Sequence, residues 1–158
     1  MSPYLVIERS ISISAEPEDI FPYINDLEEM NDWSPWFALD KDATYYYDGP
    51  ERGKGQIAIW ESSIAHIANG QQEIIASQSP DFVKTTLFAN NQILDVTYAI
   101  YEDEGEALGQ SVVILRTEND LGGFPYLQRI MIHFRKARIY GPYDEALLRL
   151  KHITEPSE

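Results

Sequence analysis

The sequence contains no cysteine among its 158 residues. Disulfide bonds, thiolate nucleophiles and thiolate metal ligands are therefore excluded. No apolar run approaches the roughly 20 residues that span a bilayer. The chain also opens without the basic segment and long apolar stretch of a secretory signal. These absences predict a soluble, cytoplasmic protein without stable membrane insertion.

Basic residues are scarce, with 12 Lys and Arg against 26 Asp and Glu and a formal net charge of −14. Binding to a nucleic acid backbone needs clustered cations, so nucleic acid is not an expected partner. Attraction to an anionic membrane surface is disfavoured for the same reason.

Recognisable metal and phosphate motifs are also missing. His66, His133 and His152 are too scattered in the sequence to form a zinc motif. The glycine-rich segment 49–55 lacks the spacing of a phosphate loop and the Ser or Thr after Lys54, so we expect a hairpin turn there. The sequence predicts neither a metal nor a cofactor.

A long amphipathic helix from about Pro125 to Ile153 is the clearest pattern that is present. Apolar residues recur there at steps of three and four, which places them on one helical stripe. The break at Gly141-Pro142 predicts a kink rather than an end, because the stripe resumes beyond it. The stripe consists of Leu127, Ile130, Phe134, Ala137, Tyr140, Tyr143, Leu147 and Leu150.

Almost everything before this helix has the pattern of strands. Tyr4 to Ile13 is the first expected strand, and Ser14 is expected to cap a short helix that begins near Pro17. A second short helical turn is expected from Leu27 to Met30. Six further strands are expected at residues 44–48, 56–62, 71–77, 82–88, 93–101 and 111–118. Consecutive strands with helices set apart predict an antiparallel α+β domain that spans residues 1–158.

Five segments carry a resemblance to a known family: Ile20-Phe21, Trp33-Ser34-Pro35-Trp36, Gly53-Lys54-Gly55, the strand Ile57 to Ser62, and the closing Ala146 to Lys151. In this order they resemble the START/Bet v 1-like superfamily, and within it the polyketide cyclase/dehydrase-like SRPBCC proteins. The resemblance implies a helix-grip fold. In that fold a curved antiparallel sheet of about seven strands wraps around the long carboxy-terminal helix, with a cavity between them.

The family pattern places Trp60 on the inner face of its strand, although alternation alone leaves the face undecided. Ile57 and Ile59 would then be exposed, which suggests a homodimer or a covered outer face. The alternative to a cavity is a packed core without room for a ligand. The residues expected at the ligand are Trp33, Trp36, Tyr47, Trp60, Phe88, Tyr98, Tyr101, Arg116, Phe124, Leu127, Met131 and Phe134.

These residues have different expected roles. Phe88 and Tyr98 would form part of the wall, and the residues from Phe124 to Phe134 the floor. Hydroxyl groups of Tyr47, Tyr98 and Tyr101 would orient the ligand. The loop with Trp33 and Trp36 is a candidate gate. Arg116 would bind a ligand anion if it points inward, whereas it would pair with a neighbouring acid if it points outward, which is the favoured orientation.

Three functions are compatible with this pattern. The first is a carrier or sensor that binds a small hydrophobic molecule, either lipid-like or aromatic. The second is a polyketide cyclase- or aromatase-like enzyme that uses His133, a weak candidate, or a tyrosine for proton transfer in the same cavity. The third is a protein-interaction module that uses the outer face of the sheet.

Overall fold

In the computed structural model, residues 4–35, 40–64, 69–89, 92–105, 109–120 and 126–156 are described, with the backbone alone at residues 4–5, 92, 120 and 126–139. The chain begins with β1 (Tyr4–Ile13), α1 (Pro17–Ile24) and the short 3-10 helix η1 (Glu29–Asp32). The strands β2 (Thr44–Asp48), β3 (Ile57–Glu61), β4 (Gly70–Gln78), β5 (Phe82–Ala89), β6 (Gln92–Glu102) and β7 (Ser111–Asp120) follow, and α2 (Tyr126–Thr154) comes last.

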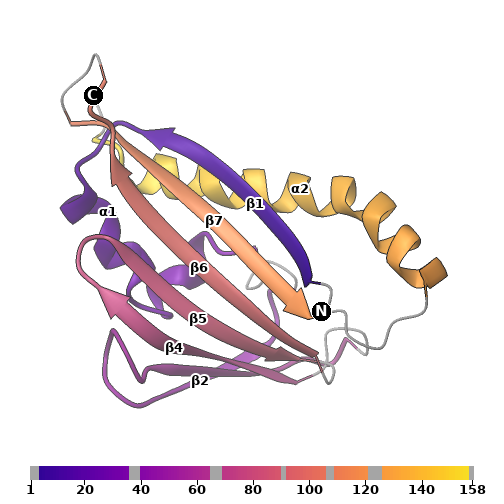
Figure 1. Cartoon of the computed structure of the whole chain (residues 1–158). Helices are drawn as coiled ribbons and strands as arrows, with labels where there is room; N and C mark the ends of the chain where they lie inside the picture. Colours follow the sequence, from indigo (N-terminus) through magenta and orange to yellow (C-terminus); the bar gives the residue numbers. More distant parts are fainter. Residues whose placement is uncertain are drawn as a thin grey trace.

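The seven strands form one antiparallel sheet in the order β1-β7-β6-β5-β4-β3-β2 (Figure 1). Strands adjacent in sequence pair as hairpins from β2 to β7, and β1 closes the sheet on the far side of β7. The strand order therefore leaves β1 and β2 as the edges. A bulge lies in β4 between Ile74 and Ala76. This architecture confirms the predicted α+β class and the predicted strands, whose ends differ by at most two residues.

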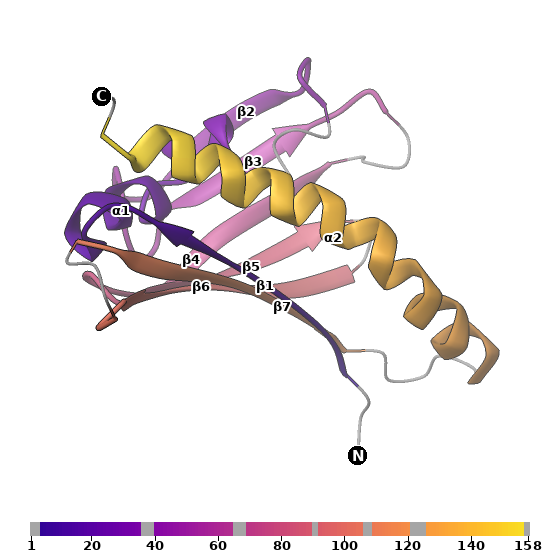
Figure 2. The same cartoon turned by 90° about the horizontal axis from the view of Figure 1, so that it is seen from above.

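The curved sheet wraps around α2, which crosses its concave side, and α1 lies between the two near one end of the sheet (Figure 2). The helix continues through Gly141-Pro142, as predicted from the apolar stripe on both sides of the break. It starts and ends within one residue of the predicted bounds. The helix and the concave side of the sheet therefore enclose the interior of the molecule.

The start of α1 corrects one prediction. The residue at the N-cap position is Glu16, not Ser14, and its side chain makes no capping hydrogen bond. Pro17 occupies the first turn, where its missing N–H is not needed and its fixed φ suits the helix. The backbone N–H of Ser14 instead donates to Glu155 Oε1 at 2.9 Å. This bond joins the end of β1 to the end of α2.

Gln56 connects the short helices to the sheet just before β3. Its side-chain oxygen accepts from the backbone N–H of Leu27 at 2.7 Å, and its Nε2 donates to Asp26 Oδ1 and to the carbonyl of Glu51. Only 2% of Gln56 is exposed. Three satisfied bonds explain how a polar side chain is tolerated there, since an unpaired buried amide would be costly. They hold the β2–β3 hairpin against the segment between α1 and η1.

Candidate functional site

Alternation along each strand decides which side chains face α2. In β3, Ala58 and Trp60 are buried, whereas Ile59 is exposed and Ile57 half-exposed. Trp60 therefore points to the concave side, and the predicted exposure is confirmed for Ile59 and only partly for Ile57. The indole of Trp60 lies against Gly70 of β4, where an added Cβ would be 2.1 Å from its Cζ2 atom. The missing side chain at Gly70 thus allows the ring to cover the next strand.

The same alternation corrects three predicted ligand residues. Phe88 follows the buried Leu87, and Tyr101 follows the buried Ile100, so both point away from α2 and are exposed. Arg116 follows the buried Leu115 and is also exposed. Its guanidinium bonds Glu118 at 2.8 Å and Glu8 at 3.3 Å. The predicted outward alternative for Arg116 is therefore the observed one, and none of these three residues faces the interior.

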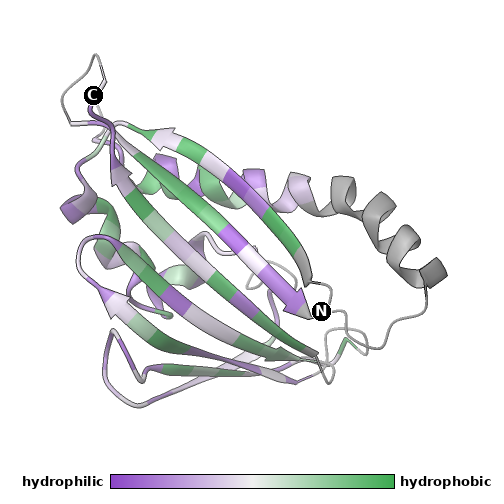
Figure 3. Cartoon of the chain, viewed as in Figure 1, coloured by the Kyte–Doolittle hydropathy of each residue, from purple (hydrophilic) through white to green (hydrophobic). Residues whose placement is uncertain are grey.

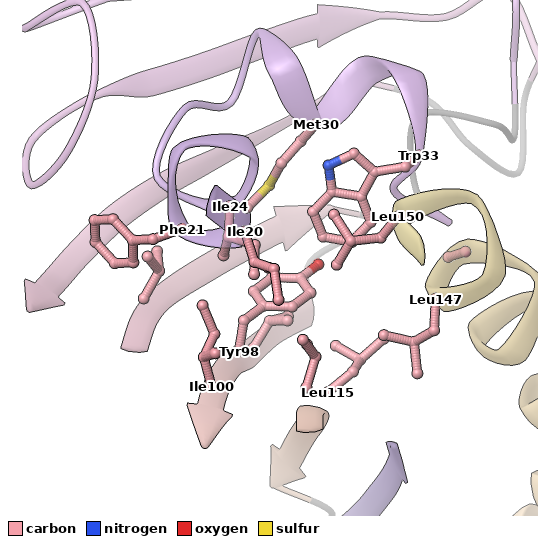
Figure 4. Close-up of a cluster of buried hydrophobic side chains, with 14 of the residues drawn as sticks. Ile20, Phe21, Ile24, Met30, Trp33, Tyr98, Ile100, Leu115, Leu147 and Leu150 are labelled. Atoms are coloured by element: carbon pink, nitrogen blue, oxygen red, sulfur yellow. The ribbon is translucent and has the colours of Figure 1, made fainter. Parts of the chain in front are cut away.

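Trp33 lies in the packed core, not at an opening (Figure 4). Its ring is fully buried and meets Tyr98 edge-to-face, with the centroids 5.3 Å apart. Its Nε1 donates to the carbonyl of Tyr23 at 3.1 Å. Leu147 and Leu150 of α2 pack beside this pair. Trp33 itself is therefore held in the core by packing and by a hydrogen bond, whereas the gate role of the loop with Trp33 and Trp36 stays a prediction, because Trp36 lies outside the described residues.

Tyr47 lies on the edge strand β2 with its side chain half-buried on the concave side, and its hydroxyl accepts from Asn31 Nδ2. Trp36 and Phe124 lie outside the described residues. Four residues of α2 have a described backbone only, so their predicted contribution to the floor, and the catalytic role considered for His133, stay predictions: Leu127, Met131, His133 and Phe134. Of the predicted site residues, the structure thus brings Tyr47, Trp60 and Tyr98 to the concave side, with Trp33 in the core above Tyr98.

Gln72 on β4 is a concave-side residue that the sequence analysis missed. It is fully buried, and its Nε2 donates to Thr85 Oγ1 of β5 at 2.9 Å. Its Oε1 atom is buried and has no hydrogen-bond partner. A buried acceptor without a donor costs about 1–3 kcal/mol. Gln72 pairs across the sheet with Ala58 and with Leu87, so this polar atom lies within an otherwise apolar surface.

A second polar pair occurs two strands away on the same side. The hydroxyl of Tyr143 in α2 donates to Thr117 Oγ1 of β7 at 3.3 Å, and both residues are buried. The sheet register places Thr85, Val96 and Thr117 side by side on β5, β6 and β7. The two polar pairs therefore flank Val96, and together they form a band of hydroxyl and amide groups across the concave side.

The phenols on this side resist ionisation. Burial is the largest cause that raises the pKa of Tyr98, and the neighbouring Tyr143 raises it further, whereas the nearby Ser34 side chain opposes the rise. Burial likewise raises the pKa of Tyr45, Tyr47 and Tyr143. All four hydroxyl groups are therefore neutral at physiological pH and act as hydrogen-bonding groups, not as charges.

Arg9 and Asp144 form an ion pair between β1 and α2. The guanidinium donates from Nε and NH2 to the two carboxylate oxygens, each at 2.7 Å. The Cζ atom of Arg9 also lies 4.7 Å from the centre of the Tyr140 ring. The hydrogen bond from Arg9 lowers the pKa of Asp144, more than partial burial raises it. This pair neutralises itself, so it offers no free charge to a ligand.

Three surface pockets of about 330, 370 and 500 Å³ surround α1 and the β2–β3 hairpin. Carboxylates dominate the walls of the first two, which share Asp26 and Arg52. Such open, acidic walls differ from the apolar lining that is typical of small-molecule sites. In the part of the chain that the structure describes, no three His, Asp or Glu side chains gather as metal ligands would. We take the concave side as the candidate site because Gln72 places an unpartnered polar atom there within apolar surface.

Solved structures share the arrangement of this chain over nearly its whole length. Norcoclaurine synthase from Thalictrum flavum, in complex with dopamine and hydroxybenzaldehyde, matches with a TM-score of 0.64 at 14% identity, over 99% of this chain and 90% of the enzyme. The KanY protein matches with a TM-score of 0.67 at 16% identity, over 98% of this chain and 99% of KanY. The chain has the helix-grip, Bet v 1-like fold.

Protein CV1439 from Chromobacterium violaceum has this fold too, with a TM-score of 0.63 at 11% identity over 96% of this chain and 99% of CV1439. No family model matches the sequence, and no curated protein matches it significantly. Identities this low establish the shared fold and no shared activity. No helix within the described residues is both long and apolar enough to cross a membrane.

Proposed function

We propose that this chain binds a small, uncharged hydrophobic molecule, aromatic or lipid-like, in a cavity between the sheet and α2, and serves as its carrier or sensor. The observation that carries the proposal is the buried, unpartnered Oε1 atom of Gln72. A ligand hydroxyl or N–H group that donates to this atom would remove the cost of leaving it unpaired. The surrounding Trp60, Ala58 and Leu87 supply apolar surface for the rest of the molecule.

The charges on the concave side favour a neutral ligand. The four tyrosines keep their protons, Arg9 is bound to Asp144, and Arg116 lies on the outer face. An anionic ligand placed near Gln72 would lose its hydration without gaining a counter-ion from these residues, which is strongly unfavourable. A phenol, an alcohol or an amide bearing a hydrophobic body meets the requirement better than a fatty acid.

We place the proposed cavity beside Gln72, on the part of the sheet from β2 to β5. At the other end, Trp33, Tyr98, Leu147 and Leu150 fill the space between sheet and helix. A norcoclaurine synthase of the same fold is known in complex with two small aromatic molecules, which supports an aromatic ligand by analogy of fold alone. The same analogy supports membership of the polyketide cyclase/dehydrase-like SRPBCC group, which the sequence pattern favours.

The described residues favour binding over proton-transfer catalysis. A general base needs a pKa near the working pH. Burial moves the pKa of Tyr98 and Tyr143 away from that range, and Asp144 is held as a carboxylate by Arg9. Polar groups that stay neutral can recognise a ligand through hydrogen bonds. The ligand is then released chemically unchanged.

Native mass spectrometry of freshly purified protein tests whether a molecule is retained. We expect an added mass that disappears on denaturation. Binding is then measured by fluorescence titration with 1-naphthol, which carries a donor, and with 1-methoxynaphthalene, which does not. We expect the naphthol to bind about five- to tenfold more tightly. This ratio corresponds to the net free energy of one hydrogen bond.

A matched variant assigns that preference to Gln72. Replacing Gln72 by Leu together with Thr85 by Val removes both polar partners and leaves an apolar wall of similar shape, which is close to neutral for folding. The variant is expected to bind the two compounds equally. If the wild-type protein binds neither compound and retains no mass, the carrier proposal is wrong. If the preference for naphthol survives in the variant, the assignment to Gln72 is wrong.

A further inference from the structure

An apolar row crosses the outer face of the sheet, on the side away from α2. The register pairs Tyr46 with Ile59, Ile59 with Gln71, Gln71 with Phe88, and Phe88 with Ile93. Paired residues of an antiparallel sheet point to the same side, so these five form one continuous line from β2 to β6. We call this line the outer row. Its four apolar members are 36–57% exposed.

The outer row is unusual because, on one side, its neighbours on β2, β4 and β6 are acidic. Two residues further along, the register aligns Asp48, Ile57, Glu73, Thr86, Asp95 and Glu118 as a parallel line, which we call the acidic row. Within the described residues, ion pairs involve only Glu118 of its four carboxylates. Glu61 lies on the opposite flank of the outer row, beside Ile59 on the same strand. Apolar surface is therefore bordered by negative charge on both sides.

This pattern disfavours a second copy of the chain as the occupant. A symmetric contact that placed one outer row on another would bring two acidic rows, or an acidic row and Glu61, close together. The whole chain also carries a net charge of −14. In addition, the outer face is the convex side of the sheet (Figure 2), and two convex faces meet only along a narrow strip. A stable dimer needs about 1,200 Å² or more of buried surface.

We propose that the outer row and the acidic row bind a basic amphipathic helix of another protein. The apolar face of the helix would lie along the outer row, across the strands, and its Lys or Arg flank would face the acidic row. This surface is separate from the concave side, so the inference does not depend on a ligand. The green segments near the right-hand ends of β5 and β6 in Figure 3 include the part of the row on these strands.

The dimensions of the row set the size of the partner. Five strands spaced at about 4.8 Å give a row roughly 19 Å long. A helix rises 1.5 Å per residue, so about 13 residues match that length. The helix would present three or four apolar residues at steps of three and four, with cations along one flank.

The probe is a synthetic helical peptide of about 14 residues, with leucines along one stripe and lysines along one flank. Fluorescence anisotropy of the labelled peptide is expected to show saturable binding that weakens severalfold as salt rises, because screening reduces the attraction between charges. NMR amide shifts are expected on β2 to β6 at the outer and acidic rows. A peptide of the same composition in scrambled order is the control for non-specific attraction of cations.

Two variants test the two rows separately. Replacing Phe88 and Ile93 by Ser is expected to weaken binding about tenfold or more, since both would be central anchors. Replacing Tyr101 by Ser, on the same face but outside the row, is the matched control and should change affinity less than twofold. Replacing Glu73 by Gln and Asp95 by Asn should weaken binding severalfold and reduce its salt dependence.

Three results would overturn the proposal. One is equal binding of the ordered and scrambled peptides. The second is an effect of the Tyr101 change as large as that of the Phe88 and Ile93 changes. The third is concentration-dependent dimerisation in analytical ultracentrifugation that the Phe88 and Ile93 changes abolish, which would assign the row to a second copy. Circular dichroism of each variant verifies that the fold is retained.

Discussion

Arg9 in the first strand and Asp144 in the last helix are joined by two hydrogen bonds of 2.7 Å across 135 residues of sequence. The edge of the planar guanidinium matches both carboxylate oxygens, and its Cζ atom lies over the ring of Tyr140. Each side chain is still 39% exposed. The pair therefore fixes the position of α2 over β1 more than it adds to stability, because solvent screens its attraction.

The lowered pKa of Asp144 gives this pair a defined pH dependence. A carboxylate whose pKa is depressed by folding stabilises the folded state above its unfolded pKa of about 4, and this contribution is lost as the pH falls through the folded value. Urea unfolding from neutral to acidic pH should show a steeper acid-side loss of stability in the wild type than in Asp144→Asn. Glu145→Gln, which alters an exposed pair with Arg149, is the control. Identical acid profiles for the wild type and Asp144→Asn would contradict this role.

Two adjacent leucines of α2 test the packing of the core. Leu147 is 1% exposed and Leu148 is 48% exposed. Truncating Leu147 to Ala removes contacts and leaves a cavity, so the free energy of unfolding should fall by about 2–5 kcal/mol. Leu148→Ala should change it by no more than about 0.5 kcal/mol. Chemical denaturation measures both, and comparable losses would mean that α2 is rotated about its axis relative to the structure.

The contact between Gly70 and Trp60 can be tested by adding a single methyl group. A Cβ at position 70 would lie 2.1 Å from the indole and 2.9 Å from the carbonyl oxygen of Phe88. Gly70→Ala should therefore lower the free energy of unfolding by about 1–3 kcal/mol and shift the fluorescence of Trp60. In a Trp60→Leu background the cost should be smaller, since one of the two clashes is gone. Strictly additive losses in the double variant would contradict the close approach of the ring.

The order and type of the elements could be predicted because turn residues separate short alternating segments along the middle of the chain. The side of the sheet toward which each residue points could not be predicted for every strand. In β3 both sides carry apolar groups, Ile57 and Ile59 on one side and Ala58 and Trp60 on the other, so alternation alone gives no preference. The register pairs Ala58 with Gln72 and Gln72 with Leu87, so these three residues point to the same side of the sheet. Because Leu87 is buried, this side is the inner one.

The candidate site was predicted less well, for a physical reason. From the sequence, Phe88 is predicted in the wall and Tyr101 as a polar group at the ligand, yet each follows a residue that occupies the inner position, Leu87 and Ile100. Gln72 was missed because a glutamine in a strand usually faces water. Its position between Gln71, which is exposed, and Glu73 gives no local signal of burial. Only the long-range pairing of β3, β4 and β5 reveals it.

Ligand binding on the concave side against Gln72 is testable by NMR of nitrogen-15-labelled protein during titration with 1-naphthol. We expect progressive shifts of the Gln72 side-chain amide and the Trp60 indole N–H. The indole N–H of Trp33, bonded to Tyr23, should remain in place. Saturable shifts confined to α1, its neighbouring pockets or the outer row, with the Gln72 amide unchanged, would contradict it.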